Sequence, residues 1–182
     1  PEMMPFLNEL AKSSVTAEVE TVSDAVTVPA IRAAFTGKTR FRVLGFVDNL
    51  VKRKENLPSL FSQLNSHGGK SAAFTDGSFN QFGSSITKKF PMSDSTVSAK
   101  GETKYKMQNA QGINALNFFR ENLDYDFVLY HAGYMDHVAH KYSVRSPLYK
   151  ELFNKGDELV RTIAQSMKPN ETLIVFGDHG HT

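Results

Sequence analysis

A short apolar run near the C-terminal end of the chain constrains the fold more than any other feature. Four apolar residues, Leu173 to Phe176, lead directly into the sequence Gly177-Asp178-His179-Gly180. A short run without polar residues predicts a strand buried on both faces, as in a parallel sheet. In such sheets, ligands bind beyond the carboxyl ends of the strands. We therefore expect Asp178 and His179 to lie in a functional site.

The same arrangement occurs a second time. The apolar run Phe127–Tyr130 is followed, after a short loop, by Asp136 and His140. A carboxylate and an imidazole four residues apart can face one ion, and this donor set suits zinc. The alternative is a pair of ordinary surface residues on a polar turn. A second Asp-His set at another strand end favours the metal-ligand interpretation.

Composition excludes several classes of protein. The 182 residues are 40% hydrophobic and 22% charged, as in an ordinary globular domain. The net charge of +2 is too small to predict a nucleic-acid partner. No apolar run reaches the roughly 18 residues of a transmembrane helix. Cysteine is absent, so any metal must be bound by His, Asp, Glu or hydroxyl groups.

Helical and strand patterns alternate along the chain, which predicts an α/β fold with a doubly wound, mainly parallel sheet flanked by helices. Apolar spacing and capping residues predict the helices, and short β-rich runs predict the strands. We expect 81–101 to be irregular. The expected helices are 5–12, 27–36, 57–67, 108–122 and one that begins at Pro147 and ends before Pro169; the expected strands are 14–22, 70–75, 127–130 and 173–176.

Thr27 lies at the expected start of a helix. Pro29 follows within the first turn, and Gly37 is a suitable helix stop. The free N–H groups and the positive dipole end of a helix favour an anion such as phosphate. Thr27 is therefore either a nucleophile, activated by a base or a metal, or a plain N-cap.

Three further residues have weaker support. Asp76 follows an expected strand, and we interpret it as a turn former before Gly77 rather than a site residue. Asn49 carries an amide that could donate to a phosphoryl oxygen. His181 is either a metal ligand or an exposed tail residue.

The three site motifs, in this order and at these separations, resemble those of the alkaline phosphatase superfamily. They are Thr27-x-Pro29 with Gly37, Asp136-x-x-x-His140, and Gly177-Asp178-His179-Gly180. Within the superfamily, the chain is most similar to the eukaryotic GPI ethanolamine phosphate transferases that act on the second or third mannose. Supporting segments are 27–32, 35–37, 45–48, 55–57, 74–79, 126–131, 136–140 and 146–147.

The resemblance implies a zinc-dependent transferase with an alkaline-phosphatase-like α/β sandwich. Thr27 would be the nucleophile and would contact two zinc ions, one held by Asp136 and His140 and the other by Asp178 and His179. The donor would be phosphatidylethanolamine and the acceptor a mannose of the GPI precursor glycolipid. The family's catalytic domain faces the lumen of the endoplasmic reticulum, is followed by membrane spans and works with a small membrane partner subunit.

The chain departs from the family pattern at several positions. The first strand, whose end carries a metal-binding Asp, and a downstream metal-binding His have no counterpart. We therefore interpret residues 1–182 as one partial catalytic domain, cut at both ends, that binds metal weakly and is inactive alone. Tyr134 and Ala139 replace glycines, and Lys52 stands where the family has Asn, a residue for which Asn49 could stand in.

Two rival functions stay open. A phosphodiesterase, nucleotide pyrophosphatase or sulfatase of the same superfamily would use the same residues, with water as the acceptor. The departures at Lys52, Tyr134 and Ala139 are also compatible with a non-catalytic membrane-complex subunit whose site has decayed.

Overall fold

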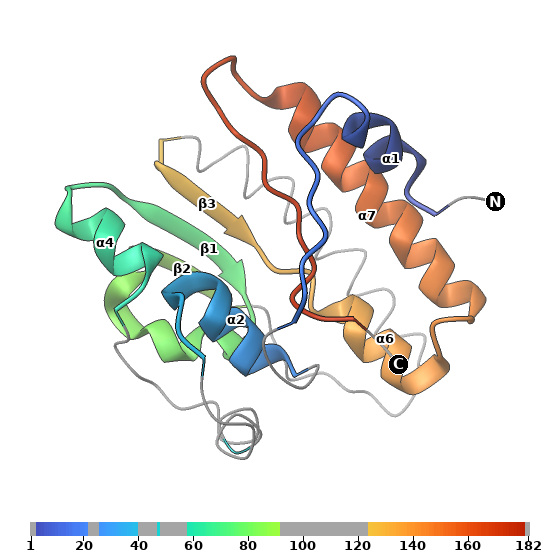
Figure 1. Cartoon of the computed structure of the whole chain (residues 1–182), viewed down its shortest axis with the longest axis horizontal. Coiled ribbons are helices and arrows are strands. Elements are labelled where there is room, and N and C mark those ends of the chain that lie inside the picture. Colours follow the sequence, from blue (N-terminus) through green and yellow to red (C-terminus); the bar gives the residue numbers. More distant parts are fainter. Residues whose placement is uncertain (1–2, 22–25, 40–46, 48–57, 92–123, 181–182) are drawn as a thin grey trace.

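A three-stranded parallel sheet is the centre of the structure. A computed structural model of the chain describes residues 3–21, 26–39, 47, 58–91 and 124–180. The strands lie in the order β2 (Lys88–Pro91), β1 (Ser71–Thr75) and β3 (Phe127–Tyr130). Their carboxyl ends point to one edge of the sheet (Figure 1). The predicted α/β class, with a parallel sheet flanked by helices, is confirmed and is consistent with part of an alkaline-phosphatase-like fold.

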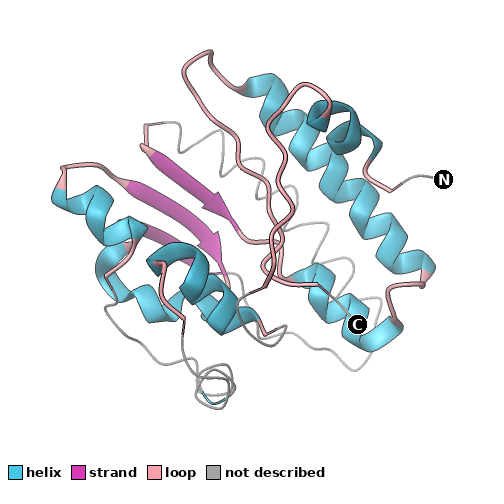
Figure 2. Cartoon of the chain, in the orientation of Figure 1, coloured by secondary structure: helices cyan, strands magenta, loops and turns pink. Residues whose placement is uncertain are grey.

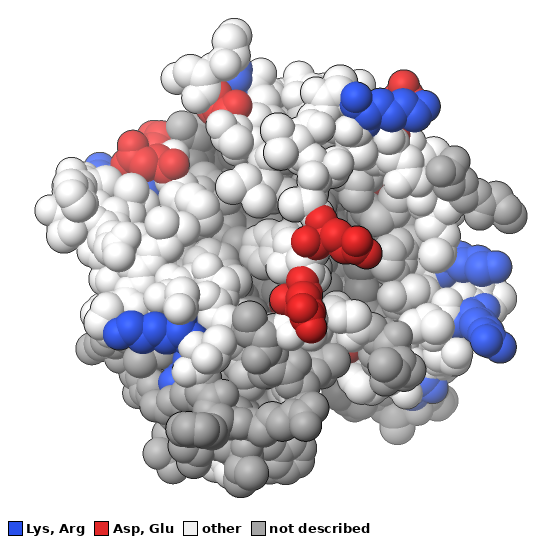
Figure 3. Space-filling view, viewed as in Figure 1, with Lys and Arg blue, Asp and Glu red and all other residues white. Residues whose placement is uncertain are grey.

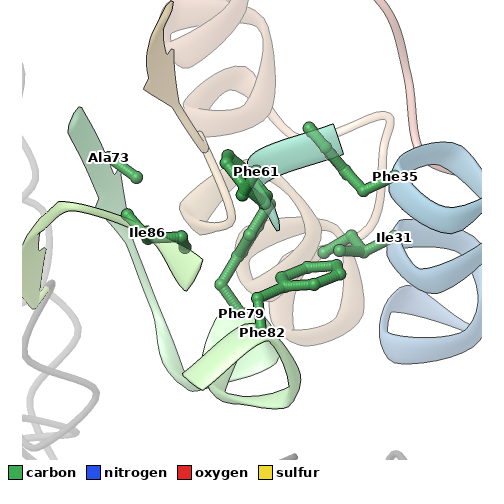
Figure 4. Packing of buried hydrophobic residues seen from close by; sticks show 7 residues of the cluster. All are labelled: Ile31, Phe35, Phe61, Ala73, Phe79, Phe82 and Ile86. Carbon is green, nitrogen blue, oxygen red and sulfur yellow. The ribbon is translucent and has the colours of Figure 1, made fainter. Parts of the chain in front are cut away.

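One face of the sheet is covered by α2 (Thr27–Thr36), α4 (Leu60–Ser66) and the 3₁₀ helix η1 (Gly77–Ser85). Phenylalanines dominate the core between them (Figure 4). The rings of Phe35 and Phe61 stack with centroids 5.0 Å apart. Burying a large apolar side chain contributes about 1.5–3 kcal/mol, so this cluster fixes α2 against the sheet. Its buried members are Ile31, Phe35, Phe61, Ala73, Phe79, Phe82 and Ile86.

The remaining helices, α1 (Pro5–Ala11), α6 (Tyr134–Tyr142) and α7 (Pro147–Ser166), lie on the other side of the molecule (Figures 1 and 2). A second buried cluster joins α6 to α7 and consists of Tyr134, Val138 and Leu152. None of the helices in the described ranges is long and apolar enough to cross a membrane.

Helix boundaries follow from local sequence. At Gly37 the backbone is left-handed, with φ of 66°, and α2 ends there. The side chains and backbones of Ser59 and Ser62 form a capping box at the start of α4. At the start of α7, Ser146 accepts from the N–H of Tyr149, and Pro147 occupies the first turn. The predicted helices at these three places are confirmed.

Two strand predictions are wrong. The run Leu173–Phe176 forms no strand, and Ile174 and Phe176 are 71% and 52% exposed. The described part of the expected strand 14–22 also forms none, and Val15 is fully exposed. Both segments fail to form strands for the same physical reason. A buried parallel strand requires hydrogen-bonded neighbours, and within the described residues neither segment pairs with the sheet.

The expectation of an irregular segment at 81–101 is also wrong for its described part, which contains the end of η1 and the strand β2. Two lysines and a proline hide the strand pattern of β2. Such residues are typical of an edge strand, and β2 is one of the two edge strands of the described sheet. The predicted helix 108–122 lies outside the described residues.

Charge is unevenly distributed on the face seen in Figure 3. Two groups of acidic side chains lie near its middle, whereas Lys and Arg side chains lie toward its margin. Concentrated negative charge raises the local concentration of cations.

Candidate active site

Thr27 and His179, which are 152 residues apart in sequence, meet at the start of α2. The Oγ1 atom of Thr27 lies 3.1 Å from Nε2 of His179. Thr27 is the first residue of α2, and the N-cap is the extended residue Val26, so the N-cap interpretation of Thr27 is wrong. Its side chain is instead directed at an imidazole.

The first turn of α2 is held in place by η1. The side-chain amide of Gln81 donates to the backbone carbonyl of Val28, at 3.1 Å, and to that of Ser78, at 3.0 Å. The carbonyl oxygen of the same amide accepts from Nε of Arg32, and both side chains are buried. Hydrogen bonds between buried polar groups are costly to break. They therefore fix the turn that carries Thr27.

His179 is oriented by its own loop. Its Nδ1 lies 2.8 Å from the carbonyl oxygen of Gly180, an acceptor, so Nδ1 carries the proton and Nε2 presents its lone pair. The His179 side chain is only 7% exposed, and Nε2 also lies 3.5 Å from Oδ2 of Asp178. A ring fixed in this way by a backbone carbonyl is typical of a metal-binding histidine.

Asp136 and His140 form the second predicted pair. They lie on α6 at the i and i+4 positions, and Oδ1 of Asp136 is 3.3 Å from Nε2 of His140. The His140 side chain is 68% exposed and that of Asp136 31%. Both side chains therefore lie on the same side of α6, and their binding of one ion stays a prediction.

The two pairs fit zinc in chemistry and spacing. Two ligands of one tetrahedral zinc ion, each about 2.05 Å from the metal, lie about 3.3 Å from each other. The carboxylate-to-imidazole distances are 3.3 Å in one pair and 3.5 Å in the other. However, no three His, Asp or Glu side chains form one metal-binding group among the described residues. The predicted ligands therefore stand as two separate pairs.

A third carboxylate–imidazole pair was missed as a site by sequence reasoning. Asp76, at the end of β1, and His131, at the end of β3, lie 3.5 Å apart between Oδ1 and Nδ1. Asp76 also caps η1, because its Oδ1 accepts from the N–H of Ser78 at 2.8 Å. The turn-forming interpretation is thus confirmed, but it is incomplete. The strand-end rule marks Asp76 and His131 as separate candidates, but it does not say that they pair.

Burial alone would raise the pKa of the Asp76 carboxyl, but its partners outweigh burial. The hydrogen bond and charge of His131, together with the N–H of Ser78, hold this pKa well below its usual range. Asp76 is therefore ionised at neutral pH, although its residue surface is only 8% exposed.

Tyr149 lies near Asp136, and Tyr130 lies beside Tyr134. Burial raises the pKa of Tyr134, and burial together with the nearby Tyr134 hydroxyl raises that of Tyr130. The pKa of Tyr149, on α7, is raised first by burial and then by the negative charge of Asp136. All three phenols therefore stay protonated at neutral pH and can act as hydrogen-bond donors.

Two predicted site residues, Asn49 and His181, lie outside the described residues. The structure thus brings Thr27 together with Asp178 and His179, and Asp136 together with His140. A hydroxyl at a helix start, beside an oriented imidazole, belongs to the class of site that uses a hydroxyl nucleophile.

Comparison with known families agrees with this class. The sequence profile of the type I phosphodiesterase / nucleotide pyrophosphatase family matches residues 1–182. The chain belongs to this family, a group of phosphoester-cleaving enzymes within the alkaline phosphatase superfamily. No curated protein gives a significant match.

Proposed function

We propose that Thr27 is the nucleophile of a phosphoryl-transfer reaction and passes through a phospho-threonine intermediate. The observation that supports this most directly is the 3.1 Å contact between Thr27 Oγ1 and His179 Nε2. A free threonine hydroxyl is a weak nucleophile and requires a base or a metal beside it. The first turn of α2 adds free N–H groups and a positive dipole end, which favour the phosphate group of a substrate.

The two Asp-His pairs are the proposed ligands of two zinc ions. Asp136 and His140 would hold one, Asp178 and His179 the other, with Thr27 in contact with them. When bound, zinc lowers the pKa of a coordinated hydroxyl and neutralises charge on the phosphoryl oxygens. Catalytic zinc sites usually have three protein ligands, so residues 1–182 alone should bind zinc weakly.

The proposed donor is phosphatidylethanolamine. The Oγ1 atom of Thr27 loses its proton and forms a bond to phosphorus, and the bond from phosphorus to the diacylglycerol oxygen breaks. Diacylglycerol leaves as the free alcohol after that oxygen takes up a proton. An acceptor hydroxyl then attacks the phosphorus of ethanolamine phospho-threonine and gives up its own proton, and the Thr27 hydroxyl is restored.

The proposed acceptor is a mannose hydroxyl of the GPI precursor, as in the transferases that the motifs resemble. This assignment places the catalytic domain in the lumen of the endoplasmic reticulum, beside a membrane and a small membrane partner subunit. Asn49 is the proposed donor to a phosphoryl oxygen. The proposed acceptor, location and partner subunit rest on the resemblance carried by the order and spacing of Thr27, Asp136/His140 and Asp178/His179.

A phosphodiesterase is the second candidate, and the family match favours it. The first half of the reaction would be the same, but water would attack the phospho-threonine. The two candidates differ in the fate of the phosphoryl group. Mass spectrometry of the products with and without a mannoside acceptor separates them, because only the transferase forms a phosphomannoside.

Replacement of Thr27 in the full-length protein tests the proposal. Thr27→Ala removes the hydroxyl and is expected to abolish phosphoryl transfer, whereas Thr27→Ser keeps it and should retain part of the activity. If Thr27→Ala transfers ethanolamine phosphate at the wild-type rate, the assignment of the nucleophile is wrong.

A further inference from the structure

We infer that Asp76 and His131 form a positioning pair that sets the orientation of α6, the helix that carries Asp136 and His140. The claim that α6 binds zinc rests on the proposed function above. The claim that the pair positions α6 does not. Neither residue is assigned a role by the motifs that define the proposed site.

The pair joins two neighbouring strands at their carboxyl ends. β1 and β3 are parallel, and their last register pair is Phe74 opposite Tyr130. One step beyond it, the N–H of His131 donates to the carbonyl of Phe74 at 3.0 Å. The Asp76 carboxylate and the His131 imidazole then face each other at 3.5 Å. The pair therefore lies at the edge where parallel sheets keep their sites.

Both side chains are held on more than one side. The Asp76 side chain is 9% exposed and the His131 side chain 16%. The Asp76 carboxylate also accepts from the N–H of Ser78, and the His131 ring packs against that of Phe79 with centroids 5.3 Å apart. Because Ser78 and Phe79 belong to η1, the same helix that fixes α2 also fixes the pair. Removal of His131 would leave the buried Asp76 carboxylate without its imidazole neighbour, and a buried charge that loses a partner is costly.

The connection from the pair to α6 is very short. Only Ala132 and Gly133 separate His131 from the first residue of α6. A Cβ added at Gly133 would lie 3.1 Å from Oδ2 of Asp76 and 3.1 Å from Cε1 of His131. The backbone at the start of α6 thus rests directly on the pair. Asp136 follows in the first turn, so a rotation of His131 would be passed to the helix.

The amino ends of the same strands provide a control with an exposed carboxylate. There, Oδ2 of Asp126 accepts from the N–H of Lys70 at 2.8 Å. This carboxylate also joins β1 to β3, but at the end away from α6. A residue that merely stabilises the sheet should behave like Asp126, whereas a positioning residue should not.

Hydrogen exchange in the metal-free, full-length protein tests the positioning role. Asp76→Ala and His131→Ala should each accelerate exchange at the amides of 137–140 on the order of 10-fold, because α6 opens locally. Asp126→Ala should leave these amides unchanged. The conservative variants Asp76→Asn and His131→Asn retain hydrogen-bonding groups and should restore part of the protection. Equal effects of Asp76→Ala and Asp126→Ala on α6 would overturn the inference.

Zinc titration of the same variants separates the two claims. If the positioning role and the zinc assignment are both correct, Asp76→Ala and His131→Ala weaken zinc binding about 10-fold. Residues that orient a metal ligand typically change metal affinity by about 10–100-fold. If exchange responds as expected but Asp136→Asn and His140→Asn do not change zinc binding, the positioning role stands and the zinc assignment fails. Unchanged exchange at α6 overturns the positioning role, whatever the zinc titration gives.

Discussion

Gly133 lies against the carboxylate of Asp76 so closely that a Cβ added to the glycine would be 3.1 Å from Oδ2. This distance is shorter than most contacts of real Cβ atoms. Gly133→Ala should therefore push Asp76 and His131 apart and destabilise the protein by about 1–3 kcal/mol, as overpacking does. Urea unfolding measures the loss.

Gly180→Ala is the control for this substitution, since a Cβ at Gly180 would meet nothing within 4 Å. It should leave the free energy of unfolding within about 0.5 kcal/mol of wild type. Equal stability of the two variants would contradict the close packing at Gly133.

Asp157 should anchor α1. Its two carboxylate oxygens accept from the N–H groups of Phe6, at 2.9 Å, and Leu7, at 2.8 Å. These are free donors of the first turn, and hydrogen bonds to a charged group contribute about 1.5–3 kcal/mol each. Asp157→Ala should lower the free energy of unfolding by about 3 kcal/mol and expose α1 to proteases.

Glu158→Ala is the matched control on the same helix, because the Glu158 side chain is exposed. Limited proteolysis should cut near α1 faster in Asp157→Ala than in Glu158→Ala. Equal cleavage rates would show that the carboxylate does not hold the helix.

The lowered pKa of Asp76 predicts a pH dependence of stability. The folded state favours the ionised carboxylate, so the contribution of Asp76 is present above its unfolded pKa of about 3.9 and is lost as the pH falls below it. The difference in unfolding free energy between the wild type and Asp76→Asn should be at its full size above about pH 5 and should shrink as the pH falls through 4 toward 3. A difference that stays constant over this range would contradict the assigned direction of the shift.

His179 should matter far more for turnover than an unrelated histidine. Its Nε2 faces Thr27, whereas His67 lies exposed at the end of α4 and contacts the carbonyl of Gln63. His179→Ala is expected to lower turnover about 10–100-fold, and His67→Ala should leave it unchanged. Steady-state rates of phosphodiester cleavage in the full-length protein check this. Similar rates for the two variants would remove His179 from the site.

Sequence predicted the elements whose signals are local. The capping residues at Ser59 and Ser146, the stop at Gly37 and the i, i+4 spacing of Asp136 and His140 all depend on nearby residues. The contact of Thr27 with His179 was not predicted as such, because the resemblance implied only that both residues belong to one site.

Other features depend on contacts that no local pattern contains. The run Leu173–Phe176 has the composition of a buried strand, but pairing decides whether it joins a sheet, and in the described structure it remains exposed. The pairing of Asp76 with His131 brings together positions 55 residues apart. It depends on β1 lying beside β3, and single-sequence patterns do not give strand order.

The covalent intermediate is the most direct test of the central claim. The full-length protein would be mixed with phosphatidylethanolamine without an acceptor, quenched in acid, digested and mapped by tandem mass spectrometry. We predict ethanolamine phosphate on Thr27, absent from Thr27→Ala and reduced when a mannoside acceptor is added. Release of diacylglycerol with no adduct on Thr27, or with the adduct on another residue, would contradict the account.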